Sequence, residues 1–432
     1  MAWAVPPPEV TGRQIVVFAE ADDDAPGIDW ARAGISGVAD SRDFEGGHVS
    51  PEALQEAPAT VFSELGIAVV SADVTQVGAL QAAGAESRPV LSVSPELVHH
   101  VLHHEALHHE RAGYAQAYRD GVNDLVERLA HAPHDAALSG VEVAGPGRFA
   151  DTSQATWGIQ ATKAISSSRS GRGIRVAVLD TGFDLGHPDF AGRTVSAESF
   201  VQGESAQDGH GHGTHCIGTS CGPRSPSTGP RYGVAYEADI YSGKVLGNSG
   251  SGSDAGILAG INWAVANRCP VISMSLGADV QQSHPPYSAA GRRALRRGSL
   301  IIAAAGNNAN RRAGNHGFVG APANSVEIMA VGAIDGDLGM ANFSARSLPG
   351  RGGQVDIAGP GVQVYSSWPM PTRYRTISGT SMATPHVAGL AALWAEATGR
   401  RGLDLWATLC AESERLLQPS LDVGSGLALA PQ

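Results

Sequence analysis

The stretch IRVAVLDTG at residues 174–182 decides the fold of this chain. It is a short run of β-branched and aliphatic residues that ends on Asp180 and a turn, which is typical of a buried strand. Similar runs recur at regular intervals and alternate with segments of helical periodicity. This pattern predicts an α/β fold: a doubly wound, mostly parallel sheet with helices on both faces. The expected strands are Ile174–Asp180, Ile240–Leu246, Val271–Leu276, Leu300–Ala305 and Ile328–Ile334, and the expected helices are His212–Ser220, Ser253–Ala266, Tyr287–Arg297, Thr380–Thr398 and Leu403–Leu417.

The first 150 residues differ from the rest in charge. They hold 22 Asp and Glu against 8 Arg, a net of −14, whereas residues 151–432 hold 20 acidic and 22 basic residues, a net of +2. This asymmetry marks a domain boundary near residue 150. We expect a small α+β domain over 12–97, a His-rich helical linker over 98–150 and the large domain over 151–432. Within the first 97 residues, strands are expected at 14–20, 67–73 and 89–94, and helices near 51–65 and 74–84.

Composition excludes several classes of protein. The 432 residues are 42% hydrophobic and 17% charged, which rules out a disordered chain and favours two domains. A net charge of −12 with no basic stripe argues against nucleic acid as a partner. No apolar run is long enough for a membrane span, and the opening MAWAVPPPEVTGR lacks a secretory signal, so we expect a cytoplasmic location or an unconventional export route. Four cysteines are too few for a disulfide scaffold.

Three residues at separate points of the large domain are candidates for one site. Asp180 ends a strand, His212 lies in DGHGHGTHCIG, and Ser381 lies in SGTSMATPHVAG. In an open parallel sheet the carboxyl ends of the strands meet at one crevice, so these residues can converge. A serine becomes a nucleophile when an imidazole removes its proton, and a carboxylate fixes the tautomer of that imidazole. Each residue taken singly is more often a structural cap, but together, in this order, they predict nucleophilic catalysis.

A fourth segment, IIAAAGNNA at 301–309, supplies what such a site further needs. The tetrahedral intermediate of acyl transfer carries an oxyanion, which preorganised donors stabilise. The side-chain amide of Asn307, leaving the end of a strand, is a suitable donor beside the backbone N–H of Ser381. An Asn after Gly is otherwise a turn residue.

The four segments resemble the subtilisin-like serine protease family. The resemblance runs from about Trp157 to the C-terminus and rests on DTGFDLGHPDF (180–190), HGTHCIGT (212–219), SMSLG (273–277), AAAGN (303–307), AVGAID (330–335), IAGPGVQVYSS (357–367), GTSMATPHVAG (379–389) and GSGL (424–427). It implies a serine endopeptidase that works through an acyl-enzyme, with Asp180, His212 and Ser381 as the triad and Asn307 as the oxyanion donor. It also implies polypeptide substrates, a monomeric enzyme and no cofactor for catalysis.

The same resemblance implies how substrate binds. An extended peptide is expected to add as a strand between two protein segments, so that backbone pairing gives affinity and side-chain pockets give selectivity. The two segments are Gly250, Ser251 and Gly252 on one side and Ser275, Leu276 and Gly277 on the other, and the primary pocket is formed by Ala304, Ala305, Gly306 and Gly320. None of these segments carries a carboxylate, so we expect broad specificity for apolar or aromatic residues at the scissile bond.

Two positions in the large domain bear on metal ions and thiols. Asp189 matches a position that often ligates a structural calcium ion, but the loop that usually completes that site, GPRSPSTGPRY at 222–232, lacks Asn and Asp. Calcium binding there is therefore doubtful. Cys216 lies four residues after His212 and so on the same helical face, as in the thiol-bearing, proteinase K-like branch of the family. The alternative is a small buried hydrophobe with sensitivity to mercurials as a side effect.

The N-terminal domain resembles the inhibitory propeptide of such proteases, which implies a self-processed zymogen with its own propeptide as a partner. Only the strand-like pattern of QIVVFAE and VLSVSPE carries this resemblance, and about fifty residues separate these segments from the large domain. We therefore expect processing within about 145–153, just before Trp157.

Two rival interpretations remain open at the level of the sequence. His104 to His108 read HEALH, a match to the HExxH pattern of zinc metalloproteases, although the surrounding histidine cluster makes a chance match easy. The cluster could also bind zinc or nickel adventitiously, respond to pH or form a solvated helix. A catalytically silent binding module with the same fold is the other alternative.

Overall fold

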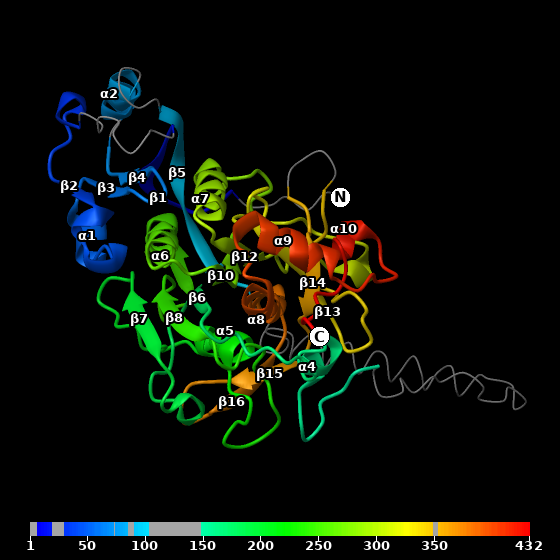
Figure 1. The fold of residues 1–432 in the computed structure, drawn as a ribbon. Coiled ribbons are helices and arrows are strands. Elements are labelled where there is room, and N and C mark those ends of the chain that lie inside the picture. The colour runs from blue at the N-terminus through cyan, green and yellow to red at the C-terminus, as the bar shows by residue number, and fades with distance from the viewer. Residues whose placement is uncertain (1–6, 20–29, 73, 85–89, 103–147, 349–352) are drawn as a thin grey trace, which may run out of the picture.

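The computed structural model describes residues 7–19, 30–72, 74–84, 90–102, 148–348 and 353–432. Two sheets organise most of these residues, a large parallel sheet in the second half of the chain and a mostly antiparallel sheet built chiefly from the first half (Figure 1). None of the helices in the described ranges is long and apolar enough to cross a membrane.

The large sheet confirms the predicted α/β class. Its seven strands run in the order β14-β13-β12-β10-β6-β8-β7, and every neighbouring pair is parallel. Five of them are the expected strands, with ends shifted by a few residues. The bounds are β6 Arg175–Asp180, β7 Val195–Ser199, β8 Asp239–Lys244, β10 Val271–Met274, β12 Leu300–Ala304, β13 Met329–Ile334 and β14 Ile357–Pro360.

Helices cover both faces of this sheet because successive strand residues point to opposite sides. Val176 and Val178 belong to a buried cluster with α5 and α8, whereas Ala177 and Leu179 belong to a cluster with α6 and α7. Asp180 then stands at the carboxyl end of β6, an interior strand of the sheet. The helices are α4 Trp157–Ala161, α5 His212–Cys221, α6 Asp254–Ala266, α7 Pro285–Arg296, α8 Thr380–Thr398, α9 Gly402–Ala411 and α10 Ser420–Val423.

The small domain contributes five strands, packed against α6 and α7, to a seven-stranded sheet (Figure 1). The other two strands are β9 Ser251–Ser253 and β11 Leu276–Gly277 of the large domain. The five strands of the small domain follow the order β5-β1-β4-β3-β2. One face shares a continuous hydrophobic core with the large domain, through residues such as Ile15, Phe62 and Leu65. The other face has its own small core, which includes Val16 and Phe18. The elements are β1 Val10–Phe18, β2 Val38–Asp40, α1 Pro51–Glu56, β3 Ala59–Phe62, β4 Ile67–Val70, α2 Val74–Gly84 and β5 Val90–Val101.

Several predicted bounds were wrong. The helix expected near 51–65 ends at Glu56, because Pro58 follows at once and the next four residues form the buried strand β3. The helical linker expected from residue 98 does not begin there, because β5 continues to Val101. The expected helix over 403–417 ends at Ala411. Residues 103–147, with most of the predicted linker and the HEALH match, lie outside the described residues.

Four short strands of the large domain were not predicted from the sequence: β7, β14, β15 and β16. β7 is half-buried along its whole length and carries two serines and a glutamate, so it lacks an apolar run. β14 contains Gly359 and Pro360, which normally argue against a strand. The antiparallel pair β15 Val364–Ser367 and β16 Tyr374–Ile377 forms a separate two-stranded sheet.

Candidate functional site

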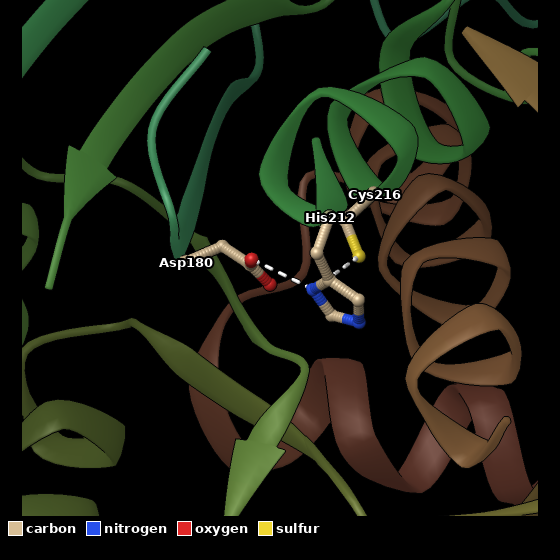
Figure 2. A group of neighbouring side chains, drawn as sticks. All are labelled: Asp180, His212 and Cys216. Atoms are coloured by element: carbon tan, nitrogen blue, oxygen red, sulfur yellow. Dashed lines mark hydrogen bonds and ion pairs between the residues drawn. The ribbon is translucent and has the colours of Figure 1, made fainter. Parts of the chain in front are cut away.

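Asp180 and His212 form a buried pair at the carboxyl end of β6. Asp180 is the last residue of the strand, and His212 is the first residue of α5. The carboxylate oxygen Oδ1 lies 2.7 Å from Nδ1 of His212, and both side chains are buried (Figure 2). Because the carboxylate accepts the proton on Nδ1, Nε2 is the nitrogen that can take up another proton. This arrangement suits His212 to act as a base.

Two glycines allow this close approach of helix and strand. A Cβ atom at Gly213 would lie 2.2 Å from the carbonyl oxygen of Gly182, so only glycine lets α5 pack against the turn after β6. Gly211, at the N-cap of α5, has φ of 108°, a left-handed conformation that favours glycine. The local backbone therefore fixes His212 beside Asp180.

Asp208 is a further residue at this turn, and sequence reasoning did not single it out. Its carboxylate accepts hydrogen bonds from the backbone N–H groups of His210, Gly211 and Thr214 and from the Thr181 and Thr214 hydroxyls. It therefore ties the turn after β6 to the segment that enters α5. A buried carboxylate that organises consecutive backbone N–H groups holds a loop in one conformation. An Asp four residues before a glycine-flanked His was the available signal.

Cys216 lies one turn along α5 from His212. Its Sγ atom is 3.8 Å from Nδ1 of His212 and 3.6 Å from the backbone carbonyl oxygen of Ser381 (Figure 2). Burial raises the pKa of this thiol well above its usual range. The ligand atoms of Asp180, His212 and Cys216 all lie within 4.8 Å of one another, so a thiophilic metal ion bound there would occupy the acid–base pair.

Ser381 opens α8 and faces the same space. It is the second residue of a 19-residue helix, where backbone N–H groups and the helix dipole favour negative charge. Its hydroxyl donates a hydrogen bond to the carbonyl oxygen of Leu102 and lies 3.2 Å from that of Ser275. The side chain of Ser275 in turn donates to the carbonyl oxygen of Ser381 at 2.8 Å. Ser381 is thus held against a carbonyl group of the small domain.

Asn307 contacts the same carbonyl group from another direction. Its Nδ2 atom donates to the oxygen of Leu102 at 2.7 Å. Its Oδ1 atom accepts from the backbone N–H of Thr380 at 3.0 Å and from the Thr380 hydroxyl at 2.9 Å. Because Oδ1 is held by two donors, the amide can present only its N–H group to the carbonyl. The Leu102 oxygen therefore lies where two donors converge.

The end of β5 lies between two segments of the large domain. It pairs antiparallel with β9 (Ser251–Ser253) on one side and with β11 (Leu276–Gly277) on the other. The backbone N–H of Val101 donates to the carbonyl oxygen of Gly250 at 2.9 Å. All six residues of the predicted substrate-binding segments face this strand: Gly250, Ser251, Gly252, Ser275, Leu276 and Gly277.

The residues expected to form the primary pocket lie beside Gly277. A Cβ atom at Gly277 would lie 2.9 Å from Cδ1 of Leu102, so this glycine leaves room for the leucine side chain. Ala278 pairs with Ala321, which brings the neighbouring Gly320 alongside. The predicted pocket residues Ala304, Ala305, Gly306 and Gly320 are all buried, and the N–H of Gly320 donates to the carbonyl oxygen of Ala305 at 3.1 Å.

The predicted calcium position has a different set of partners. The Asp189 carboxylate accepts hydrogen bonds from Ser227 and from the hydroxyls of Tyr232 and Tyr374. Burial opposes ionisation, but these hydrogen bonds lower the pKa of Asp189. Its oxygens are thus engaged by donors, and within the part of the chain that the structure describes no other carboxylate joins them. This donor set does not fit a calcium ion, which needs several oxygen ligands.

An open parallel sheet with a His–Asp pair, a serine at a helix N-terminus and an amide donor at one crevice defines a serine hydrolase. The Subtilase family model matches residues 171–409. Subtilisin DY of Bacillus licheniformis is 40% identical over 240 residues, which cover 54% of this chain and 81% of that protein. Subtilisin Savinase of Lederbergia lenta is 44% identical over 241 residues, 55% of this chain and 82% of that protein. Thermitase of Thermoactinomyces vulgaris is 42% identical over 226 residues, 52% of this chain and 76% of that protein.

The chain therefore belongs to the subtilase family and is a serine endopeptidase. It acts on polypeptide substrates, and peptidases of this family need no cofactor for catalysis. The family match begins at residue 171 and does not include the small domain.

Proposed function

We propose that this chain is the zymogen of a serine endopeptidase and that its N-terminal domain inhibits it as a bound product. One observation carries the proposal: the carbonyl group of Leu102 accepts hydrogen bonds from both Ser381 and Asn307, while the strand that ends there fills the cleft between β9 and β11. This is where the carbonyl group of a scissile bond would lie. The antiparallel pairing supplies the backbone recognition that an extended substrate uses.

In this proposal each residue has one role. Ser381 attacks the scissile carbonyl carbon, and His212 takes up the hydroxyl proton and passes it to the leaving amine. Asp180 holds the imidazole in the required tautomer and stabilises its cation. Asn307 and the backbone N–H of Ser381 stabilise the oxyanion. Water then hydrolyses the acyl-enzyme by the same proton path in reverse.

We place the processing site between Leu102 and His103 rather than within 145–153. The support is the position of the Leu102 carbonyl group, about fifty residues before the site that the start of the large domain suggested. Cleavage there would leave residues 1–102 as the inhibitor. The His-rich segment would remain on the amino terminus of the enzyme until a second cut.

Leucine at this position also bears on specificity. The predicted pocket beside it consists of small buried residues, so an apolar or aromatic side chain would lose water without stranding a charge. A lysine or arginine would enter without a partner. We therefore propose broad specificity for apolar residues on the amino side of the scissile bond, the place that Leu102 holds. We also propose that the enzyme is a monomer and that no calcium ion binds at Asp189.

The test follows the mass of the chain during incubation. The wild-type protein should lose its full length of 44.4 kDa and give an amino terminus at His103, whereas Ser381→Ala should remain intact. A fluorophosphonate probe should label the processed wild-type enzyme at Ser381. A new amino terminus within 145–153 and none at His103 would contradict the placement. Hydrolysis that survives Ser381→Ala but stops with a chelator would favour the zinc alternative in the linker.

A further inference from the structure

His99 is fully buried in a pocket of the large domain. It is the fourth residue on the amino side of the proposed cleavage point, counting Leu102 as the first. Its neighbours in β5, Val98 and His100, are half-buried and exposed, as strand alternation predicts. His99 pairs with Gly252 of β9, so this strand register sets its depth in the cleft.

The pocket around His99 is built on a buried carboxylate. Nε2 of His99 lies 2.7 Å from Oδ1 of Asp254, the first residue of α6. The hydroxyl of Tyr287 donates to the same oxygen at 2.6 Å, and its ring meets the imidazole edge to face at 5.4 Å between centroids. Nε2 of His284 lies 3.0 Å from Oδ2. Asp254, His284 and Tyr287 all belong to the large domain, so the pocket persists after the small domain leaves.

Asp254 is charged in this setting. Burial opposes its ionisation, yet His99 and His284 hold the pKa of Asp254 well below its usual range. Its place in the first turn of α6 also favours a negative charge. When β5 departs, the carboxylate loses two of its partners, the imidazole of His99 and the backbone N–H of Leu97 at 2.7 Å. A substrate backbone can replace the N–H group, but only a side chain that donates a hydrogen bond can replace the imidazole.

We propose that Asp254 makes the fourth substrate position selective for histidine over apolar residues. This inference rests on the proposed function, because it assumes that a substrate binds in the same position and register as β5. A leucine or phenylalanine there would cover a buried carboxylate without donating to it, which leaves the charge under-solvated. A glutamine has a donor at similar reach but lacks the ring that meets Tyr287 edge to face. A glutamate would bring a second negative charge into the pocket.

The experiment measures kcat/KM of the self-processed enzyme on acetyl-Xaa-His-Val-Leu p-nitroanilides, in which Xaa is His, Gln, Leu, Phe or Glu. The kcat/KM of the histidine peptide should exceed that of the leucine and phenylalanine peptides by about tenfold or more, as expected for a hydrogen bond to a charged group. Glutamine should lie between, and glutamate should be slowest. The ratio of two peptides is taken within each enzyme, so differences in active concentration cancel.

Three variants locate the preference. Asp254→Asn should reduce the ratio of histidine to leucine, and Asp254→Leu should invert it. Asp404→Asn removes an exposed carboxylate in the first turn of α9 and should keep the wild-type ratio. Fluorophosphonate labelling identifies variants that have folded.

Two outcomes are distinct. If no peptide is hydrolysed in a Ser381-dependent way, the proposed function fails. If the peptides are hydrolysed but leucine or phenylalanine matches histidine in the wild type, the selectivity inference is overturned and the protease remains. The free acid acetyl-His-His-Val-Leu should also be a competitive inhibitor, with an inhibition constant about tenfold lower than that of acetyl-Leu-His-Val-Leu. This measurement reports binding alone, because no bond is cleaved. Equal inhibition would likewise overturn the inference.

Discussion

Asn307→Ala removes one of the two groups that contact the Leu102 carbonyl oxygen. The Nδ2 atom that it deletes lies 2.7 Å from that oxygen, in a crevice where Ser381 is fully buried. During acyl transfer this oxygen becomes an anion, so the donor is worth more in the transition state than in the bound substrate. We therefore expect kcat to fall and KM to change little.

The size of the effect follows from how the amide is held. Loss of the amide donor in subtilisin, a member of the same family, costs about a hundred- to a thousandfold in kcat, or about 2.7–4 kcal/mol. We expect the upper part of that range, because two hydrogen bonds from Thr380 fix the amide before substrate arrives. Thr380→Val keeps the Asn307 donor but removes one of those two bonds, together with the hydrogen bond that the Thr380 hydroxyl accepts from the backbone N–H of Gly306 at 3.2 Å. One neutral hydrogen bond is worth about 1 kcal/mol, so this variant should lose roughly fivefold.

The assay is steady-state hydrolysis of a leucyl p-nitroanilide by enzyme titrated with a fluorophosphonate. Asn307→Asp serves as a control of equal size, because its carboxylate cannot donate and repels the oxyanion, so it should be at least as slow as Asn307→Ala. A kcat for Asn307→Ala within threefold of wild type, or a loss confined to KM, would refute the role assigned to this amide.

Three further results are expected. In a panel of chromogenic peptides that differ only at the residue before the scissile bond, those with leucine or phenylalanine should be hydrolysed faster than those with arginine. Faster hydrolysis of the arginine peptides would show that a carboxylate lines the pocket. An organomercurial should inhibit the wild type by occupying Cys216 beside His212. Cys216→Ser should resist it and the control Cys410→Ser should not, so equal inhibition of both variants would place the reactive thiol elsewhere. Burial raises the pKa of the Asp356 carboxyl from 3.8 to about 7. Because the folded chain then holds a proton that the unfolded chain releases near pH 4, this group favours folding below pH 4, and its contribution is lost as the pH rises through 7. In a Ser381→Ala background, Asp356→Asn should therefore flatten the decline in Tm between pH 5 and 8, and an unchanged slope would assign the decline to other groups.

Much of the site follows from the periodicity of the sequence. The carboxyl ends of parallel strands meet at one edge, so Asp180, His212 and Asn307 could be expected to converge once the strands were identified. The family resemblance, rather than periodicity, implied that the segments 250–252 and 275–277 flank an extended peptide, and β5 pairs with both of them.

The residues that fill the cleft could not be predicted in the same way. His99 and His100 interrupt the apolar pattern of β5, so the strand seemed to end before them, although its last residues pair with the large domain rather than with strands of the small domain. Asp254 looks like an ordinary acid in the first turn of a helix. The pocket around His99 forms only in the folded chain, because its residues come from separate helices. Asp254 begins α6, whereas His284 is the N-cap of α7 and Tyr287 lies in α7.

β5 is shared between the small domain and the peptidase, and in the proposed zymogen this sharing would tie inhibition to the folding of the small domain. Its first half is held by β1 of the small domain and its last residues by β9 and β11 of the peptidase. The strand can block the cleft only while the rest of its domain stays folded around it. Each freed enzyme molecule can digest such domains once they unfold, so liberation of a few molecules should hasten that of the rest. The proposed zymogen would therefore be activated irreversibly, with a lag followed by an accelerating rise in activity.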